Sequence, residues 1–506
     1  MKKLTIFMIG VFSMSNLFAQ DITDALSYSQ DEIQGSARFR ALSGAFGALG
    51  GDMSAVSLNP AGAAIFNRSH ASMSLSSINI NNDVSFFNEK NSSSESKIDL
   101  HQAGGVFVFA NTNSNSSWKK FVISLAYDKT ANHDDQWFAS GRNTNSVDNY
   151  FLAYAQGLRL DEISRFTGET ISQAYAEIGN SYGYGNQQAF LGYESFILEP
   201  INDTDENTAY VSNIAQGTFN QQYDYISEGY NGKVSFNAAT QYKDKLYLGI
   251  NLNAHFINYE KYTFLRETNS NPGSLVTNVG FENNLLTTGN GFSFQLGAIF
   301  KLTEGLRAGF TYNSPTWFRI NEETTQSISA FVDDIDDDEP TKNVNPNIVN
   351  IFPEYKLRSP GKISGSLAYV FGNKGLLSFD YSRRDYSNIE FKPEDDIFFR
   401  SQNEVINNIF KVANTYRFGG EYKHKQFSFR GGYRFEESPY EDESFVGDLT
   451  GFSLGLGYNF GNTRLDLTYD QAERTVNNSL YSVGLTDAAK VDSINSNVTL
   501  SLAFNL

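Results

Sequence analysis

Apolar and polar residues alternate with a period of two along much of the chain, as they do in a β-strand whose two faces meet different surroundings. The last residues show the pattern well, with apolar side chains at Val498, Leu500, Leu502, Phe504 and Leu506. The intervening face of such segments is rich in Gly, Ser and Asn and poor in charge. A water-soluble sandwich would carry more charge on that face, so the pattern favours a membrane barrel with a polar lumen.

The alternation predicts fourteen strands, near 71–87, 99–110, 119–129, 229–242, 246–265, 290–302, 306–326, 355–371, 375–392, 410–422, 426–437, 451–460, 464–473 and 495–506. Every second connection is short, as at 243–245, 303–305 and 372–374. Short turns at one end and long loops at the other are typical of outer-membrane barrels. We therefore predict an all-β fold, a transmembrane 14-stranded antiparallel β-barrel over residues 71–506, with both chain ends on the periplasmic side.

The longest connection, 130–228, is polar and aromatic. Within it, apolar residues from Ile163 to Ile178 fall near helical spacing after Asp161, which predicts a loop helix. We expect this helix to fold down as a cap, and an apolar platform that collects ligand at the cell surface is the alternative. A second loop, 327–354, carries Asp333, Asp334, Asp336, Asp337, Asp338 and Glu339. This run lacks the Gly and distal Glu of a known calcium loop, so we expect a solvated acidic loop without metal.

Two segments precede the first strand. Residues 1–19 read as a secretory signal peptide, with Lys2 and Lys3 before a short apolar stretch and Ala19 at the end. Residues 20–70 then contain a small, apolar, Gly-rich centre, Ser43 to Gly62. Outside the barrel this centre would expose its apolar side chains to water, so we predict that residues 20–70 form a hatch that plugs the lumen.

Particular hatch residues are candidates for gating and binding. Glycine allows close backbone approach and positive φ, and Asn-Pro marks a turn. On these grounds the gating candidates are Gly44, Gly47, Gly50, Gly51, Asp52, Asn59, Pro60 and Ala61. Arg38 and Arg40 are the nearby basic candidates to pair with Asp52. The apolar side chains expected to meet a ligand are Phe46, Leu49, Met53 and Val56.

Composition narrows the function further. The chain has 506 residues, a formal net charge of −18 and no Cys, so disulfides, thiolate metal sites and Cys nucleophiles are excluded. The acidic balance disfavours nucleic acid as a partner. Gly451-Phe452-Ser453-Leu454-Gly455 matches a serine nucleophile motif, but it lies inside a predicted strand. The five scattered histidines are expected on polar faces, with haem ligation as the weaker alternative. We expect no enzyme, no cofactor and no metal.

The hatch resembles that of the outer-membrane long-chain fatty acid transporter (FadL) and toluene-transporter family. The matching residues are Gly44, Gly51-Asp52 and Asn59-Pro60-Ala61. Later segments are similar as well, namely 305–318, 357–371 and 416–440. The resemblance implies the barrel with its hatch, uptake of hydrophobic molecules, and lateral release through a gap beside a kinked third strand, here about Lys119 to Lys129. Neither Pro nor Gly lies there to make the kink.

The resemblance thus implies a transporter in the bacterial outer membrane, acting by passive diffusion. Its partners would be a fatty acid or another hydrophobic small molecule, together with outer-membrane lipid and lipopolysaccharide, and the protein is expected to be a monomer. The alternative is a surface-binding, adhesion or haem-binding barrel that merely anchors the 130–228 loop. The choice between the two rests on what fills the lumen.

Overall fold

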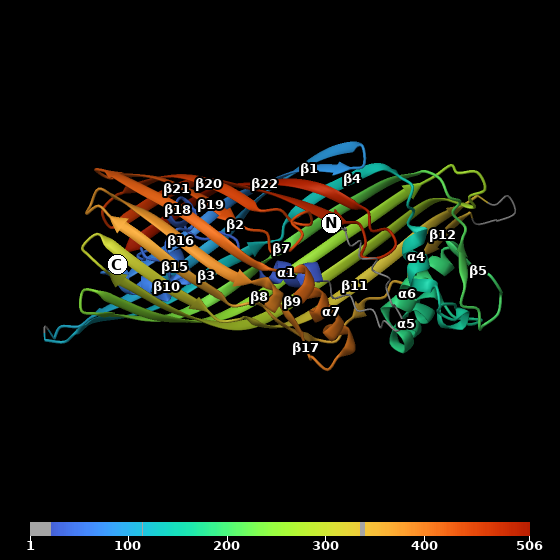
Figure 1. Cartoon of the computed structure of the whole chain (residues 1–506), viewed down its shortest axis with the longest axis horizontal. Helices are drawn as coiled ribbons and strands as arrows, with labels where there is room; N and C mark the ends of the chain where they lie inside the picture. The colour runs from blue at the N-terminus through green and yellow to red at the C-terminus, as the bar shows by residue number, and fades with distance from the viewer. Residues whose placement is uncertain (1–21, 114, 334–339) are drawn as a thin grey trace, which may run out of the picture.

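The computed structural model describes residues 22–113, 115–333 and 340–506, and in it one antiparallel sheet closes into a barrel (Figure 1). Fourteen crossings build the wall, and four of them are interrupted. The uninterrupted crossings are β1(His70–Phe86), β2(Glu89–Ala110), β7(Phe219–Tyr242), β8(Leu246–Thr268), β9(Val276–Lys301), β18(Val412–His424), β19(Phe427–Glu436), β20(Leu449–Asn459), β21(Thr463–Ser479) and β22(Ala488–Asn505). In the first interrupted crossing β3(Trp118–Asn132) continues as β4(Asp135–Asn143), and in the second β10(Leu306–Asn313) continues as β11(Trp317–Val332). The third consists of β12(Thr341–Val344), β13(Asn350–Ile351), β14(Tyr355–Arg358) and β15(Lys362–Val370). In the fourth β16(Gly375–Asp385) continues as β17(Glu390–Lys392).

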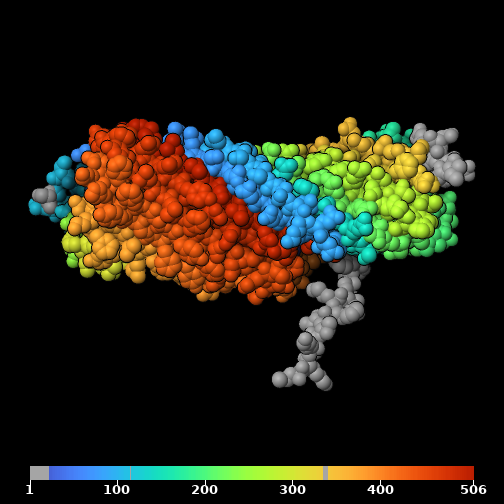
Figure 2. Space-filling view, turned by 90° about the horizontal axis from the view of Figure 1, so that it is seen from above, coloured from blue at the N-terminus to red at the C-terminus, as the bar shows by residue number. Residues whose placement is uncertain are grey.

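The first and last strands close the barrel. β1 pairs with β22 from His70↔Asn505 to Ser85↔Lys490. Figure 2 shows the result on the surface, where the blue β1 and β2 run diagonally beside the red C-terminal strands. The predicted fold class and strand number are therefore confirmed.

The two ends of the barrel differ as predicted. Short turns and the C-terminus lie at one end, here called the short-turn end, and the helices of the long connection lie at the other, the long-loop end (Figure 1). Three predicted strand starts were wrong by about ten residues or more: β2 begins at Glu89 and not near 99, β7 at Phe219 and not near 229, and β9 at Val276 and not near 290. β1 and β2 form one long hairpin with a two-residue turn. No helix among the described residues is long and apolar enough to cross a membrane.

Apolar side chains cover the outer wall. In β22, Thr499, Ser501 and Ala503 are buried inside while Val498 and Leu500 are exposed, so the predicted alternation is confirmed. Other exposed apolar side chains on the strands include Met73, Phe107, Leu125, Leu248, Leu296, Phe310, Leu367, Leu377, Phe418, Phe429, Leu454 and Leu467. An apolar outer band with a polar interior is the surface that a bilayer solvates.

The connection at the long-loop end is a folded cap. The third crossing continues as β4 and β7 starts at Phe219, so the part outside the wall is 144–218 and not 130–228. It contains α4(Asp148–Ala155), η2(Leu160–Glu162), α5(Ile171–Tyr182), α6(Tyr184–Glu194), β5(Leu198–Pro200) and β6(Tyr210–Ser212). The helix expected after Asp161 starts instead at Ile171, where Thr170 and Gln173 form a capping box.

The cap is filled by an apolar core. Ile163, Tyr175 and Ile178 are buried in it against inward-facing side chains of the tall strands, such as Phe281. Phe166 is 64% exposed. Most of the predicted apolar series is therefore packed inside the cap, and it does not form a surface platform.

The hatch lies inside the short-turn half of the barrel (Figure 1). It consists of α1(Ile22–Ser29), α2(Ala37–Arg40), α3(Met53–Leu58) and η1(Pro60–Ile65). α1 packs higher in the lumen, where Ala25, Leu26 and Tyr28 meet strand residues and α7(Ile397–Ile409) borders the same apolar cluster. The predicted signal peptide, 1–19, lies outside the described residues.

Wall glycines make room for the hatch backbone. A Cβ at Gly249 of β8 would lie 2.4 Å from the carbonyl carbon of Pro60, and one at Gly432 of β19 would lie 2.5 Å from that of Leu42. Real Cβ atoms do not approach backbone so closely, so hatch and wall are in direct backbone contact at both positions. Any side chain at these wall positions would push the hatch away.

We therefore predict that Gly249→Val loosens the hatch. Overpacking should cost about 1–3 kcal/mol, measured as the free energy of unfolding in urea. Gly365→Val is the matched control, because a Cβ at Gly365 of β15 meets nothing within 4 Å. Equal stability of the two variants would contradict a tightly seated hatch.

Candidate functional site

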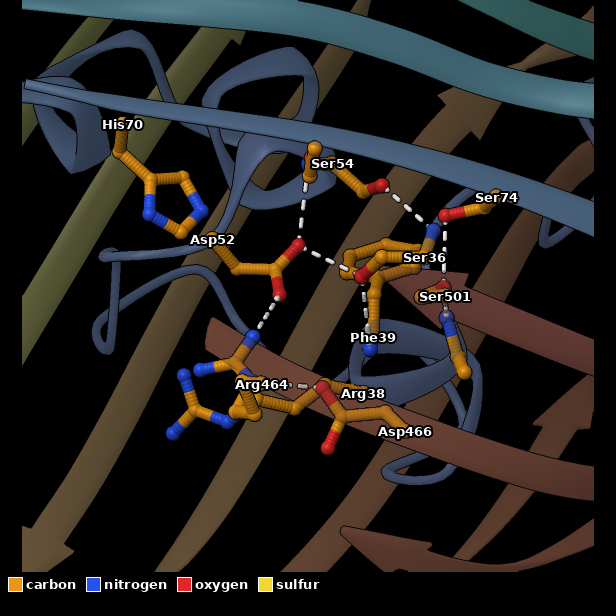
Figure 3. A network of polar contacts seen from close by, with 12 residues as sticks. Ser36, Arg38, Phe39, Asp52, Ser54, His70, Ser74, Arg464, Asp466 and Ser501 are labelled. Atoms are coloured by element: carbon orange, nitrogen blue, oxygen red, sulfur yellow. Dashed lines mark hydrogen bonds and ion pairs between the residues drawn. The ribbon is translucent and has the colours of Figure 1, made fainter. Parts of the chain in front are cut away.

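Asp52 joins two parts of the hatch to each other and to the wall (Figure 3). Its carboxylate accepts hydrogen bonds from the Ser36 hydroxyl at 2.6 Å and from the Ser54 amide at 3.1 Å, so it caps α3. The other carboxylate oxygen lies 3.6 Å from Arg464 of β21. Asp52 is 2% exposed, so this buried acid is satisfied by a cap and a cation.

Arg38 and Arg40 do not pair with Asp52, so that expectation was wrong. Arg38 binds Glu421 of β18 at 3.0 Å, and Arg40 binds Asp470 of β21 through two hydrogen bonds of 2.7 and 2.8 Å. Burial opposes the charge of Arg38, but Glu421 outweighs it and raises the pKa of Arg38 above its ordinary value. α2 thus carries two cations that point to acids on the wall, which fixes the hatch from one side.

The remaining gating candidates shape the hatch backbone. Gly44, Gly50 and Gly51 have positive φ, whereas Gly47 lies against the wall, where a Cβ would meet Ser366 of β15 at 2.9 Å or less. Asn59 caps the Pro60–Ile65 turn by accepting from the Ala61 amide, and its own amide donates to the Gly47 carbonyl at 2.7 Å. These residues hold the hatch loops together.

The four apolar residues predicted to meet a ligand are buried in hatch packing. Phe46, Leu49, Met53 and Val56 are between 0% and 3% exposed. They lie in the two clusters that seat the hatch on the wall. None lines the two larger cavities found among the described residues. A ligand would reach them only after the hatch rearranged.

Among the described residues, the cavities in the lumen above the hatch include two of about 110 and 280 Å³. Charged side chains line both: the smaller is lined by residues such as Asp128, Lys129 and Lys233, and the larger by Arg384, Arg434 and Glu436 beside apolar side chains such as Val476. The lumen at this level is therefore not purely apolar. The polar character arises because inward positions of the strands carry charged side chains at this level.

Residues 30–34 cross the lumen between these cavities. On one side Asp31 binds Lys362 of β15 at 3.0 Å and Arg384 of β16 at 2.6 Å. Burial opposes the charge of Asp31, but Arg384 and Lys362 outweigh it, so its pKa lies well below the usual range. On the other side the Glu32 amide donates to the Thr130 carbonyl of β3 at 2.8 Å. The segment therefore links opposite walls of the barrel.

The wall has a seam at the third crossing. β2 pairs with β3 only from Gln102↔Asp128 to Ala110↔Lys120, and β4 pairs with β7 alone. The edge of β2 from Glu89 to His101 therefore has no backbone ladder with β3 or β4. Side chains bridge the seam instead: Lys129 binds Asp99 at 2.5 Å and Lys97 binds Asp134 at 2.9 Å.

The seam faces the lumen. Asp128, Lys129 and Thr130, at the point where the ladder stops, line the smaller cavity. The backbone breaks here through a register shift after Lys129 and an interruption at His133-Asp134. Neither Pro nor Gly lies at this break, so the residue types there did not indicate it.

The structure also places the G-x-S-x-G match, four of the histidines and part of the acidic loop. Ser453 of the G-x-S-x-G match lies in β20 and donates to the Ala41 carbonyl of the hatch. Four histidines contact polar side chains: His70 (Asn505), His101 (Arg40), His133 (Asn231) and His255 (Ser293). Of the acidic loop 333–339, residues 334–339 lie outside the described residues. No group of three metal-ligating side chains occurs in the described ranges.

Two solved structures from pseudomonads share this architecture. A FadL homologue of Pseudomonas aeruginosa matches with a TM-score of 0.53 and 12% identity, covering 94% of this chain and 99% of the other. The toluene transporter TodX of P. putida matches with a TM-score of 0.51 and 14% identity, covering 94% and 99%. At these identities the likeness shows the fold. Among curated proteins, none matches the sequence.

A family model places the sequence more directly. Residues 206–505, more than half of the chain, match the model described as outer membrane protein transport protein (OMPP1/FadL/TodX). The match covers most of the barrel, from the end of the cap through β22. Together with the closed, plugged barrel, it shows that this chain is an outer-membrane protein that belongs to the FadL/TodX family of transporters for hydrophobic compounds.

Proposed function

We propose that the protein takes up hydrophobic small molecules, long-chain fatty acids among them, by passive diffusion and releases them sideways through the seam between β2 and β3. The observation that supports this route most is the coincidence of a seated hatch with an interrupted wall. The hatch blocks the axial path through ion pairs and backbone contact. The smaller cavity is lined by Asp128, Lys129 and Thr130 of β3, at the point where the ladder between β2 and β3 stops.

Lateral exit suits an apolar cargo. A fatty chain gains about 0.8 kcal/mol for each CH₂ that leaves water, so it prefers the bilayer to the aqueous space beyond the hatch. Opening the seam breaks no backbone ladder; it separates the two ion pairs and the side-chain hydrogen bonds by which Glu89, Asn91 and Ser93 contact β4. In this proposal the barrel acts as a monomer among outer-membrane lipid and lipopolysaccharide, and it does no covalent chemistry.

Uptake by cells tests the transport function itself. In a host that lacks its own fatty acid transporter, expression should raise the uptake of radiolabelled oleate above that of cells with the empty vector. Toluene, the compound named for the P. putida structure, serves as the second cargo. Uptake of neither compound above background would contradict the proposal. Conduction of ions through planar bilayers like an open pore would contradict it as well.

Cross-linking tests the exit. The chain has no Cys, so Asp99→Cys/Lys129→Cys can be bridged across the seam with a short bis-maleimide. Bridging should abolish oleate uptake, because the seam can no longer part. The control is Asn79→Cys/Ser496→Cys, a cross-strand pair on the continuous ladder between β1 and β22. If both bridged proteins transport alike, the cargo leaves by another path.

Two substitutions at Asp52 separate the roles of its two carboxylate contacts in holding the hatch. Asp52→Asn keeps a cap for α3 and removes the charge that faces Arg464, which retains Asp466 at 2.6 Å. Asp52→Ala also removes the cap and should lower the free energy of unfolding by about 1 kcal/mol more than Asp52→Asn. Asp83→Ala on the outer wall is the control. Faster hydrogen exchange at residues 36–58 in Asp52→Ala would accompany the loss, and unchanged exchange would speak against the anchoring role.

A further inference from the structure

The short-turn end of the barrel (Figure 1) exposes more basic than acidic side chains. The segments that form this end, here called the short-turn rim, are 66–69, 111–113, 115–117, 243–245, 302–305, 371–374, 423–426 and 460–463. The basic side chains exposed there are Arg68, Lys243, Lys245, Lys374, Lys423 and Lys425. The acidic ones are Asp244 and Glu304, and the balance stays positive with the carboxylate of Leu506 counted. The whole chain carries −18, so the rim differs in sign from the rest of the protein.

The protein itself neutralises little of this charge. Lys423 lies 3.4 Å from Glu421, a buried acid that two arginines already bind. In the part of the chain that the structure describes, the other five rim cations have no acidic side chain within salt-bridge distance. Asp244 stands between two lysines, yet its carboxylate accepts from the Gln241 amide. The rim therefore presents its positive charge to its surroundings.

A girdle of exposed aromatic side chains lies beside the rim. Its members, all within three residues of a rim segment or part of one, are Trp118, Phe300, Tyr369, Phe371, Tyr422, Phe427 and Phe460. Such girdles mark the interface between membrane and water in outer-membrane barrels. At Lys243 the rim and the girdle meet, because its Nζ lies 5.5 Å from the centre of the Tyr242 ring, which in turn packs on Trp118. The lysine ammonium thus lies at the level of lipid headgroups, with its aliphatic stem along the aromatic band.

The rim cations are distributed around the barrel. Arg68 precedes β1, Lys243 and Lys245 lie between β7 and β8, Lys374 precedes β16, and Lys425 lies between β18 and β19. A protein partner would need one continuous patch, whereas lipid around the barrel reaches every one of these turns. Short turns of outer-membrane barrels face the periplasm, so the leaflet beside the rim is made of phospholipid, and lipopolysaccharide occupies the opposite one.

We propose that the short-turn rim binds anionic phospholipids of the periplasmic leaflet, with their phosphates at Lys243, Lys245, Lys374 and Lys425 and their acyl chains against the aromatic girdle. Basic side chains at a bilayer surface attract anionic headgroups, and this attraction falls off within a Debye length. A phospholipid with a net negative headgroup, such as phosphatidylglycerol, gains this attraction, whereas zwitterionic phosphatidylcholine does not. The inference concerns how the barrel sits in its membrane, and it does not depend on the cargo.

Spin-labelled lipids test the proposal. The full chain is reconstituted in phosphatidylcholine vesicles that contain a trace of phosphatidylglycerol or phosphatidylcholine labelled on the acyl chain. Electron paramagnetic resonance then measures the fraction of each labelled lipid that the barrel immobilises. Phosphatidylglycerol should associate about twofold or more tightly than phosphatidylcholine at low salt. At about 1 M salt the preference should fall to near equality, because the Debye length shrinks to about 3 Å.

Variants locate the site on the rim. Lys243→Gln/Lys245→Gln/Lys374→Gln/Lys425→Gln should lower the association of phosphatidylglycerol to near that of phosphatidylcholine. The matched control removes four exposed cations near the long-loop ends of β2, β4, β8 and β22, namely Lys90→Gln/Arg142→Gln/Arg266→Gln/Lys490→Gln. The control has the same change in net charge and should keep the preference. Both variants should unfold at the same temperature as the native chain, because all eight side chains are exposed.

The results that would overturn the lipid site are distinct from those that would overturn hydrophobic uptake. Equal association of the two lipids with the native chain contradicts the site while uptake stands. So does a preference that survives high salt, or one that the control loses as fully as the rim variant. Capture of an acidic periplasmic protein by the rim, without any lipid preference, would assign the surface to that class of partner and overturn the proposal.

Discussion

Backbone hydrogen bonding in hydrocarbon is the constraint on which the structure depends. A bilayer offers no partner to a strand's N–H and C=O groups, so the sheet has to close on itself. The ladder from β1 to β22 meets this demand. At β2, between Glu89 and His101, the ladder with the third crossing stops, and ion pairs of Lys97 and Lys129 take over. Side chains hold the wall shut at this place.

The hatch complements this wall by two kinds of contact. Wall glycines such as Gly249 and Gly432 admit the hatch backbone at distances that no side chain would allow. Buried ion pairs from Arg38 and Arg40 then fix its orientation, because an unpaired charge in the lumen is costly. Close packing and charge pairing at the same level keep the hatch seated.

The lumen above the hatch differs in its lining from the level of the hatch. Its inward positions carry charge, and residues 30–34 join its walls through Asp31 and Glu32.

The sequence by itself determined the barrel. Period-two alternation, with a Gly- and Ser-rich second face, predicted the fourteen crossings, because each side chain's direction follows from its place in the strand. Small hatch residues and Asn59-Pro60 likewise indicated a plug, since these features are local.

Contacts between distant segments were decided only by the tertiary structure. Asp52 meets Arg464 and not the nearby Arg38 or Arg40, because the fold brings β21 to the hatch. The seam comes from a ladder that ends at Asp128, and no local residue type marks that end. Inward charges at Arg417, Arg434 and Arg474 could have been noticed in the alternation. Their convergence on one cavity required the register between strands, which a sequence period does not contain.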